Sequence, residues 1–112
     1  MTSTVHHVPA KALCLLDLPA LDALTDAQVR GAVCVWDASE QPLPTGTAVD
    51  LGERQDDGVR WFPRACRTHT GQQAYRALLD HAPLCGQCTG DADNCSTGVG
   101  LRRLMRDGRR PA

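Results

Sequence analysis

Residues 81–95 read HAPLCGQCTGDADNC, and this short stretch constrains the architecture of the chain more than any other. It brings one imidazole and three thiols into fifteen residues, at positions His81, Cys85, Cys88 and Cys95. Two cysteines separated by two residues fit around one ion in a tight turn, and four nitrogen or sulfur ligands are typical of a structural Zn²⁺ site. The spacing therefore predicts a zinc knuckle. A helix-capping histidine is the alternative for His81.

A second set of metal-type side chains lies upstream, in the pairs Cys34-x2-Asp37 and Cys66-x2-His69. A knuckle, then a β-hairpin, then a pair at the entrance to a helix is the order of a treble-clef zinc finger. Three of these groups are ordinary zinc ligands, whereas an aspartate is a less usual one. Two interpretations stay open: Asp37 completes the tetrahedron, or the site has decayed into a cluster that binds metal weakly. We therefore expect one or two Zn²⁺ ions.

The sixth cysteine, Cys14, stands apart in the apolar stretch 12–18. A free cysteine in such a setting behaves as a small buried hydrophobe, and we predict that role for Cys14. A fourth ligand in place of Asp37 is the alternative. Iron also stays an alternative metal, because three or four cysteines hold iron–sulfur clusters, but His81 and the tight spacing favour zinc.

The chain has 112 residues, of which 42% are hydrophobic, with ten glycines and seven prolines. Such a sequence is rich in turns and poor in core, and small domains of this kind need a disulfide or a metal. No run approaches the roughly 20 apolar residues of a membrane helix, and no signal peptide is recognisable. We therefore expect a cytoplasmic protein without membrane contact, whose reduced thiols hold metal.

Local patterns predict the order of the elements. The first dozen residues are expected to form a tail, and Thr25 with Gln28 has the spacing of a capping box that starts a short helix. Asp57-Gly58 is a hairpin turn pattern, and we expect residues 47–51 to pair with residues 59–62. We divide the chain into residues 1–24, a tail with a short helix, and residues 25–112, the zinc-binding domain.

Two longer helices are expected, and the first of them should pack against the hairpin. The first spans about residues 70–81, because Ala74, Ala77, Leu78 and His81 repeat at the helical period. The second is capped by Ser96 or Thr97 and carries three apolar side chains on one side: Leu101, Leu104 and Met105. The fold class predicted is small α+β, a treble-clef-like zinc finger with a second zinc knuckle and a C-terminal helix.

The charges are unevenly distributed. Residues 1–60 carry four basic and nine acidic side chains, whereas residues 61–112 carry eight basic and four acidic ones. The basic excess predicts contact with nucleic acid or with an acidic protein surface. The arginines expected to make it are Arg64, Arg67, Arg76, Arg102, Arg103, Arg106, Arg109 and Arg110. We expect a nucleic-acid-binding or transcription-associated regulator with structural zinc, and a zinc-stabilised protein-interaction adaptor is the alternative.

Over about residues 25–110 the chain resembles a group of small Cys-rich zinc-finger proteins of high-GC Gram-positive bacteria whose function is not characterised. The resemblance lies in Cys34-Val-Trp-Asp37, Trp61-Phe-Pro-Arg64, Cys66-x2-His69, the Cys85/Cys88 pair and the Leu101-Arg-Arg-Leu104 ending. In that group the positions matching Asp37 and His69 are usually cysteines, so this chain departs from the pattern at both. The resemblance implies metal binding and implies no activity.

The sequence does not favour an enzyme. A catalytic zinc keeps one position open for water and has a general base nearby, a role that Asp37 would have to fill. The hairpin between Cys34 and Cys66 contains no histidine, and the His-x-Glu and Pro-Cys-x-x-Cys pattern of zinc deaminases is missing. The βαβ context for thiol redox catalysis by Cys85 and Cys88 is also missing. We expect structural metal without catalysis.

Overall fold

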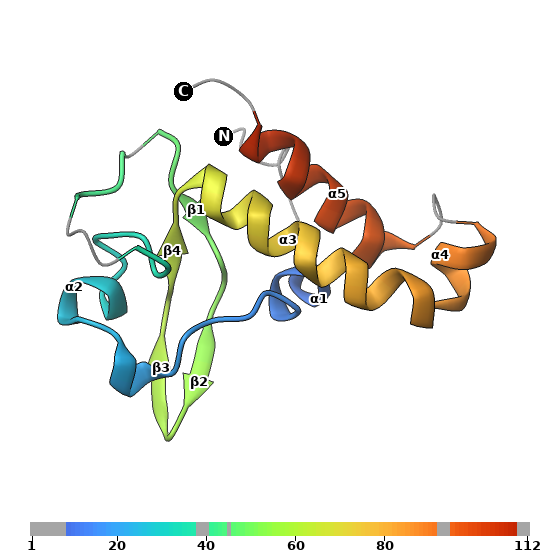
Figure 1. Ribbon diagram of the computed structural model, residues 1–112. Coiled ribbons are helices and arrows are strands. Elements are labelled where there is room, and N and C mark those ends of the chain that lie inside the picture. Colours follow the sequence, from blue (N-terminus) through green and yellow to red (C-terminus); the bar gives the residue numbers. More distant parts are fainter. Residues whose placement is uncertain (1–8, 38–40, 45, 92–94, 110–112) are drawn as a thin grey trace.

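A computed structural model describes residues 9–37, 41–44, 46–91 and 95–109 of the chain. Short helices and turns come first, two small antiparallel sheets follow, and a pair of long helices forms the second half (Figure 1). In chain order the elements are α1 Ala10–Cys14, η2 Leu21–Ala23, α2 Asp26–Val29, β1 Val49–Asp50, β2 Arg54–Asp56, β3 Val59–Trp61, β4 Arg64–Ala65, α3 Arg67–His81, η3 Ala82–Leu84, α4 Gly86–Gly90 and α5 Ser96–Gly108. This arrangement confirms the α+β class. Within the described ranges, none of the helices has the length and apolarity that crossing a bilayer requires.

Helices α3 and α5 form the largest contact of the fold and run in opposite directions (Figure 1). Two glycines let their backbones approach: a Cβ built on Gly108 would lie 3.0 Å from the Cα of Gly71. Ala74 and Leu101 are fully buried in the core cluster that spans this contact. The predicted apolar face of α3 is confirmed, and small residues on it explain how the two helices pack so closely.

Both long helices begin at a cysteine. The Cys66/His69 pair was expected at the entrance to a helix, but neither cysteine was predicted to act as the N-cap. Cys66 is the N-cap of α3, and its sulfur accepts a hydrogen bond from the His69 amide at 3.5 Å. Cys95 is the N-cap of α5, and its sulfur accepts a hydrogen bond from the Gly98 amide at 3.3 Å. Helix α3 thus starts at Arg67, earlier than expected, and the Ser96 or Thr97 cap was wrong. In both helices the cysteine sulfur accepts the hydrogen bond from a first-turn backbone amide that a serine, threonine or aspartate oxygen usually accepts at an N-cap.

The hairpin turn is confirmed, but its register differs from the prediction. Asp57 and Gly58 have φ values of 51° and 77°, and the strands they join are β2 and β3. A two-residue turn of this type fixes the pairing, so residue 56 faces residue 59 and residues 47–51 cannot pair with residues 59–62. Strand β1 pairs instead with β4. The core-facing side chain of the hairpin is Trp61, which is 3% exposed and donates to Asp56 at 2.8 Å.

The N-terminal segment is part of the core rather than a tail from residue 10 onward. Helix α1 buries Ala12, and Leu16 just beyond it is 2% exposed. Arg54 on β2 fixes the end of this helix, because its guanidinium donates to the carbonyls of Leu13 at 3.0 Å and Leu16 at 3.3 Å. Residues 10–12 were therefore wrongly assigned to an unstructured tail.

The capping box of α2 is confirmed. The side chains of Thr25 and Gln28 exchange hydrogen bonds with each other's backbone amides, at 2.8 and 3.2 Å. The buried Gln28 amide also donates to the carbonyls of Cys34 at 3.3 Å and Val35 at 3.1 Å. Helix α2 therefore positions the segment that carries the first candidate metal ligand.

Candidate metal centre

The structure brings together all four predicted ligands of residues 81–95, and we call them the C-terminal cluster: His81, Cys85, Cys88 and Cys95. Their donor atoms all lie within 4.8 Å of one another. The Cys95 sulfur is 3.4 Å from Nε2 of His81 and 3.8 Å from the Cys85 sulfur. Around a tetrahedral zinc with ordinary bond lengths, neighbouring ligand atoms are separated by about 3.6 to 3.8 Å. The cluster therefore has the dimensions of a four-ligand Cys₃His site.

Three separate elements supply these ligands. His81 is the last residue of α3, Cys85 is the N-cap of α4, Cys88 lies within α4, and Cys95 caps α5. Figure 1 shows α4 at the end of the α3/α5 pair, where it closes the two long helices. A metal ion bound here would join the end of one long helix to the start of the other.

The protein surroundings tune the thiols of the C-terminal cluster differently. Hydrogen bonds from the backbone amides of Cys88 and Gln87 lower the pKa of Cys85, because amide donors stabilise a thiolate. Desolvation, together with the neighbouring sulfurs of Cys95 and Cys85, raises the pKa of Cys88 to about 11. Three thiolates in one place repel each other, so a cation is needed before all of them ionise.

Gly98 lies against the C-terminal cluster and was not among the predicted site residues. A Cβ at this residue would lie 2.9 Å from the Cys88 sulfur and 3.6 Å from the Cys95 sulfur. No side chain fits here without displacing a ligand, since carbon and sulfur need about 3.5 Å or more. The spacing Cys95-x2-Gly98 was the available signal, because a glycine in a helix interior needs a packing reason.

The side chain of Arg102 lies beside Gly98. The Cβ built on Gly98 would be 3.5 Å from Nη1 of Arg102, so the guanidinium shares the small volume beside the Cys88 and Cys95 sulfurs. Three thiolates and one divalent cation leave a net charge of −1 at a Cys₃His site. A guanidinium next to that charge is favourable. Arg102 thus lies beside the C-terminal cluster, one helical turn after Gly98.

The second predicted site is assembled in part, and we call its three residues the N-terminal cluster: Cys34, Cys66 and His69. Their donor atoms also lie within 4.8 Å of one another. Nδ1 of His69 is 3.0 Å from the Cys66 sulfur and 3.5 Å from the Cys34 sulfur. The fourth predicted ligand, Asp37, is not a member of this group. Its amide donates to the Cys34 carbonyl at 3.1 Å, so the knuckle turn is formed although the carboxylate does not join the cluster.

Burial separates Cys34 from its two partners. Cys34 is 4% exposed, while Cys66 and His69 are half-buried. Desolvation raises the pKa of Cys34, and the backbone amides of Cys66 and Trp36 oppose this effect. A buried thiol that has amide donors and an imidazole beside it is suited to bind a metal ion as the thiolate. The two clusters lie at opposite ends of α3, about 22 Å apart at 1.5 Å per residue.

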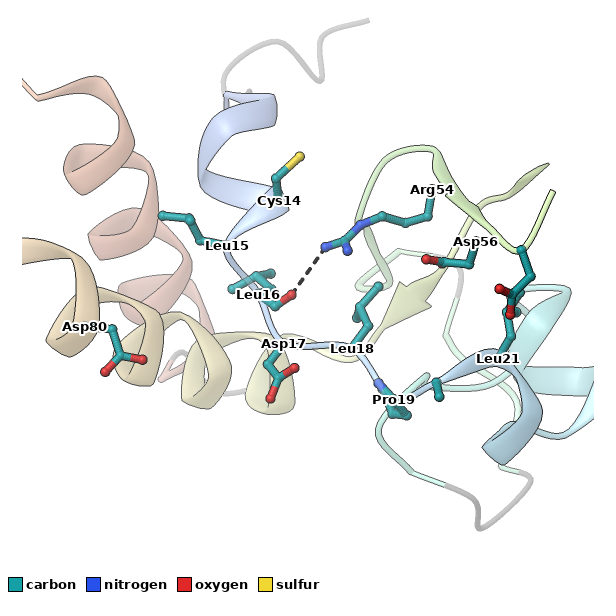
Figure 2. A pocket seen from close by; sticks show the side chains of 12 residues that line it. Cys14, Leu15, Leu16, Asp17, Leu18, Pro19, Leu21, Arg54, Asp56 and Asp80 are labelled. Carbon is teal, nitrogen blue, oxygen red and sulfur yellow. Dashed lines mark hydrogen bonds between the residues drawn. The ribbon is translucent and has the colours of Figure 1, made fainter. Parts of the chain in front are cut away.

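Cys14 is exposed, so the prediction of a buried hydrophobe was wrong, and it belongs to neither cluster. Ala12 and Leu16 are the buried side chains of this segment, which leaves the residue between them on the opposite side. Figure 2 shows Cys14 at the rim of a pocket formed by residues 14–21 with Arg54, Asp56, Asp57 and Asp80. Its sulfur therefore does not serve as the fourth ligand of the N-terminal cluster.

The predicted basic surface divides into two groups. Arg76, Arg106 and Arg109 are exposed. The half-buried members are Arg64, Arg67, Arg102 and Arg103, and Arg110 lies outside the described residues. Arg64 donates to the Gly31 carbonyl at 3.4 Å, so its guanidinium is used within the fold. The exposed three are the best placed to meet a partner.

Comparison with family models, curated proteins and solved structures gives no match for this chain. The resemblance to Cys-rich proteins of high-GC Gram-positive bacteria therefore stays a prediction.

Proposed function

We propose that the chain is a small zinc-binding domain whose metal is structural, and that it acts as a nucleic-acid-binding regulator. The observation that carries the metal assignment is the C-terminal cluster, where four nitrogen and sulfur donors lie within 4.8 Å of one another. Zinc is the ion that prefers a closed tetrahedral set of thiolate and imidazole ligands. The N-terminal cluster offers two thiols and an imidazole to a second ion.

A structural role suits the thin core of this protein. Its two-stranded sheets are too small to be stable alone, and much of the α3/α5 contact is made by glycine and alanine. Metal at the C-terminal cluster would tie α3 to α5, and metal at the N-terminal cluster would tie the segment around Cys34 to the start of α3. Metal binding and folding are then one equilibrium.

Native mass spectrometry of protein purified without chelator tests the metal. We expect two zinc ions per chain, loss of one ion in Cys88→Ser, and loss of the far-UV circular dichroism signal when a chelator is added. Cys14→Ser is the matched control, because this exposed thiol lies outside both clusters. Metal-free protein with mass evidence of paired cysteines would refute the assignment.

The nucleic-acid role is proposed from three exposed arginines: Arg76 on α3, Arg106 on α5, and Arg109 at the C-cap of α5. Arginines that contact phosphate give affinity without sequence choice. Binding to duplex DNA should weaken with salt at a log–log slope of about −0.9 for each phosphate contacted. Fluorescence anisotropy with labelled DNA at several salt concentrations measures this slope. Unchanged affinity in a triple alanine variant of the three arginines would contradict the proposal.

A protein-interaction adaptor is the second candidate, and exposed apolar side chains favour it. Tyr75 and Leu79, one turn apart on α3, are 51% and 55% exposed, and Leu84 in η3 is 89% exposed. Apolar contacts of this kind respond weakly to salt, in contrast to phosphate contacts. The salt dependence of binding therefore distinguishes the two candidates. Neither includes catalysis.

A further inference from the structure

Among the residues that the structure describes, the N-terminal cluster brings together one donor atom fewer than the C-terminal cluster. We propose that Cys34, Cys66 and His69 bind a metal ion through three protein ligands, and that the fourth position takes an exchangeable small thiolate in place of water. The inference rests on the proposed metal binding and goes beyond a purely structural role. It makes this end of α3 a ligand-binding site.

The count of donors carries the first step. Among the described residues, three donor atoms converge at the N-terminal cluster, whereas four converge at the C-terminal cluster. Asp37 occupies the position at which a knuckle normally presents its second ligand, and its amide closes the turn onto the Cys34 carbonyl. Its carboxylate nevertheless lies outside the group of donor atoms. A tetrahedral ion with three protein ligands completes its coordination with a molecule from solution.

The charge at each cluster indicates which kind of molecule would fill the fourth coordination position of the N-terminal cluster. Two thiolates and a neutral imidazole balance a divalent ion, so the N-terminal centre is neutral before its fourth ligand binds. The C-terminal centre already carries −1 with its own three thiolates. An anion can therefore join the N-terminal centre and bring it only to the charge that its neighbour has. The cluster also lies at the N-terminus of the fifteen-residue helix α3, where the helix dipole favours negative charge.

Softness selects a thiolate among small anions. Zinc and cobalt sites that already contain sulfur ligands favour a further sulfur over a hard oxygen donor. The exchange is balanced without oxidation or reduction: the metal–oxygen bond to water breaks, a metal–sulfur bond forms, and the proton of the thiol goes to solvent. Cys66 and His69 are half-buried, whereas Cys34 is 4% exposed, so a small molecule would reach the cluster on the side of Cys66 and His69.

Cobalt substitution tests the proposal with 2-mercaptoethanol as the probe. The chain is loaded with Co²⁺ at both clusters, and the sulfur-to-cobalt absorption in the near ultraviolet is followed while the thiol is added. Five cysteine sulfurs belong to the two clusters, so a sixth thiolate should raise this absorption by about one-fifth. Native mass spectrometry of the same sample counts the cobalt ions and the thiol adduct.

Variants at Asp37 test whether the rise in absorption comes from thiol binding at the fourth coordination position of the N-terminal cluster. Asp37→Ala should respond as the wild type does and keep its cobalt affinity within about threefold, because the carboxylate is not a ligand. Asp37→Cys should abolish the response and raise cobalt affinity about tenfold or more, because the chain then fills the fourth position. Cys14→Ser is the control and should behave as the wild type.

The other outcomes each decide a separate point. A response in Asp37→Ala alone would show that Asp37 is the fourth ligand and would overturn the inference. A response in no variant, or one that persists in folded Asp37→Cys, would also overturn it. Should Asp37→Cys fail to fold by circular dichroism, the comparison of wild type with Asp37→Ala decides alone. Failure of the chain to bind cobalt at either cluster would instead refute the proposed function.

Discussion

Replacing Gly98 by alanine should weaken metal binding, although the same change elsewhere in a helix is stabilising. Alanine in place of a helical glycine ordinarily contributes about 0.5 to 1 kcal/mol. At Gly98 the new methyl group would lie 2.9 Å from the Cys88 sulfur. This is short of ordinary contact by about 0.6 Å, and the 3.6 Å approach to the Cys95 sulfur blocks movement toward the other side. Both neighbouring atoms are metal ligands, so the strain falls on the C-terminal cluster.

The size of the effect follows from two opposing contributions. Overpacking of a filled site costs about 1 to 3 kcal/mol, and the gain in helix propensity offsets part of it. The net loss reaches about 2 kcal/mol, which corresponds to a roughly 30-fold weaker zinc affinity at about 1.4 kcal/mol per factor of ten. Competition with a chromophoric chelator measures this affinity, and urea unfolding of the zinc-loaded protein measures stability.

Gly86→Ala is the matched control for Gly98→Ala. Gly86 lies between the two knuckle cysteines, in helix α4, and a Cβ built on it meets nothing within 4 Å. Its replacement should leave zinc affinity unchanged and stability equal or slightly higher. Equal zinc affinities for the Gly98 and Gly86 variants would refute the claim that the missing side chain at Gly98 makes room for the ligands.

Three further predictions concern the metal and the core. Zinc affinity of the C-terminal cluster should fall steeply as pH is lowered, because the raised pKa of Cys88, about 11, keeps its proton bound at neutral pH until metal displaces it. Up to three thiol protons compete there and up to two at the N-terminal cluster, so log K should change by as much as about 3 and 2 per pH unit in chelator competition; equal slopes would contradict the assignment of ligands. Arg102→Ala should lower zinc affinity about three- to tenfold, whereas Arg106→Ala on the exposed side of α5 should not, as measured by zinc release to a chelator; the same loss in both variants would remove the special position of Arg102. Leu101→Ala should destabilise the zinc-loaded protein by about 2 to 5 kcal/mol in urea unfolding, because this side chain is fully buried; a loss below about 1 kcal/mol would show that the core relaxes around the cavity.

The C-terminal cluster was predictable because all its ligands lie within fifteen residues. Over so short a distance the local turn and two helix ends largely fix the geometry. The N-terminal cluster needs Cys34 to meet Cys66 across the whole hairpin, and its pattern gave three of the four expected ligands. Whether the Asp37 carboxylate reaches the donor atoms depends on the shape of the knuckle, which no spacing rule contains.

Other differences come from tertiary packing. A two-residue turn at Asp57-Gly58 requires residue 56 to pair with residue 59, so the hairpin register could have been predicted from the sequence. The prediction failed because it gave more weight to the alternating pattern of residues 47–51. The exposure of Cys14 was within reach of the sequence, since Ala12 and Leu16 repeat at the helical period and exclude the residue between them. The position of Arg102 beside two cysteine sulfurs could not be predicted from the sequence, because it depends on how α5 packs against α4.

A metal ion at each cluster would constrain the chain over a different length. The C-terminal cluster closes a loop of fifteen residues, His81 to Cys95, whereas the N-terminal cluster closes a loop of thirty-three from Cys34 to Cys66. Closure entropy grows with the logarithm of loop length, so a crosslink over the longer loop removes more freedom from the unfolded chain. Within the described residues, the N-terminal cluster brings together three donor atoms and the C-terminal cluster four. A metal ion at the C-terminal cluster would hold the α3/α5 pair together, and a metal ion at the N-terminal cluster would fix the segment around Cys34 to the start of α3.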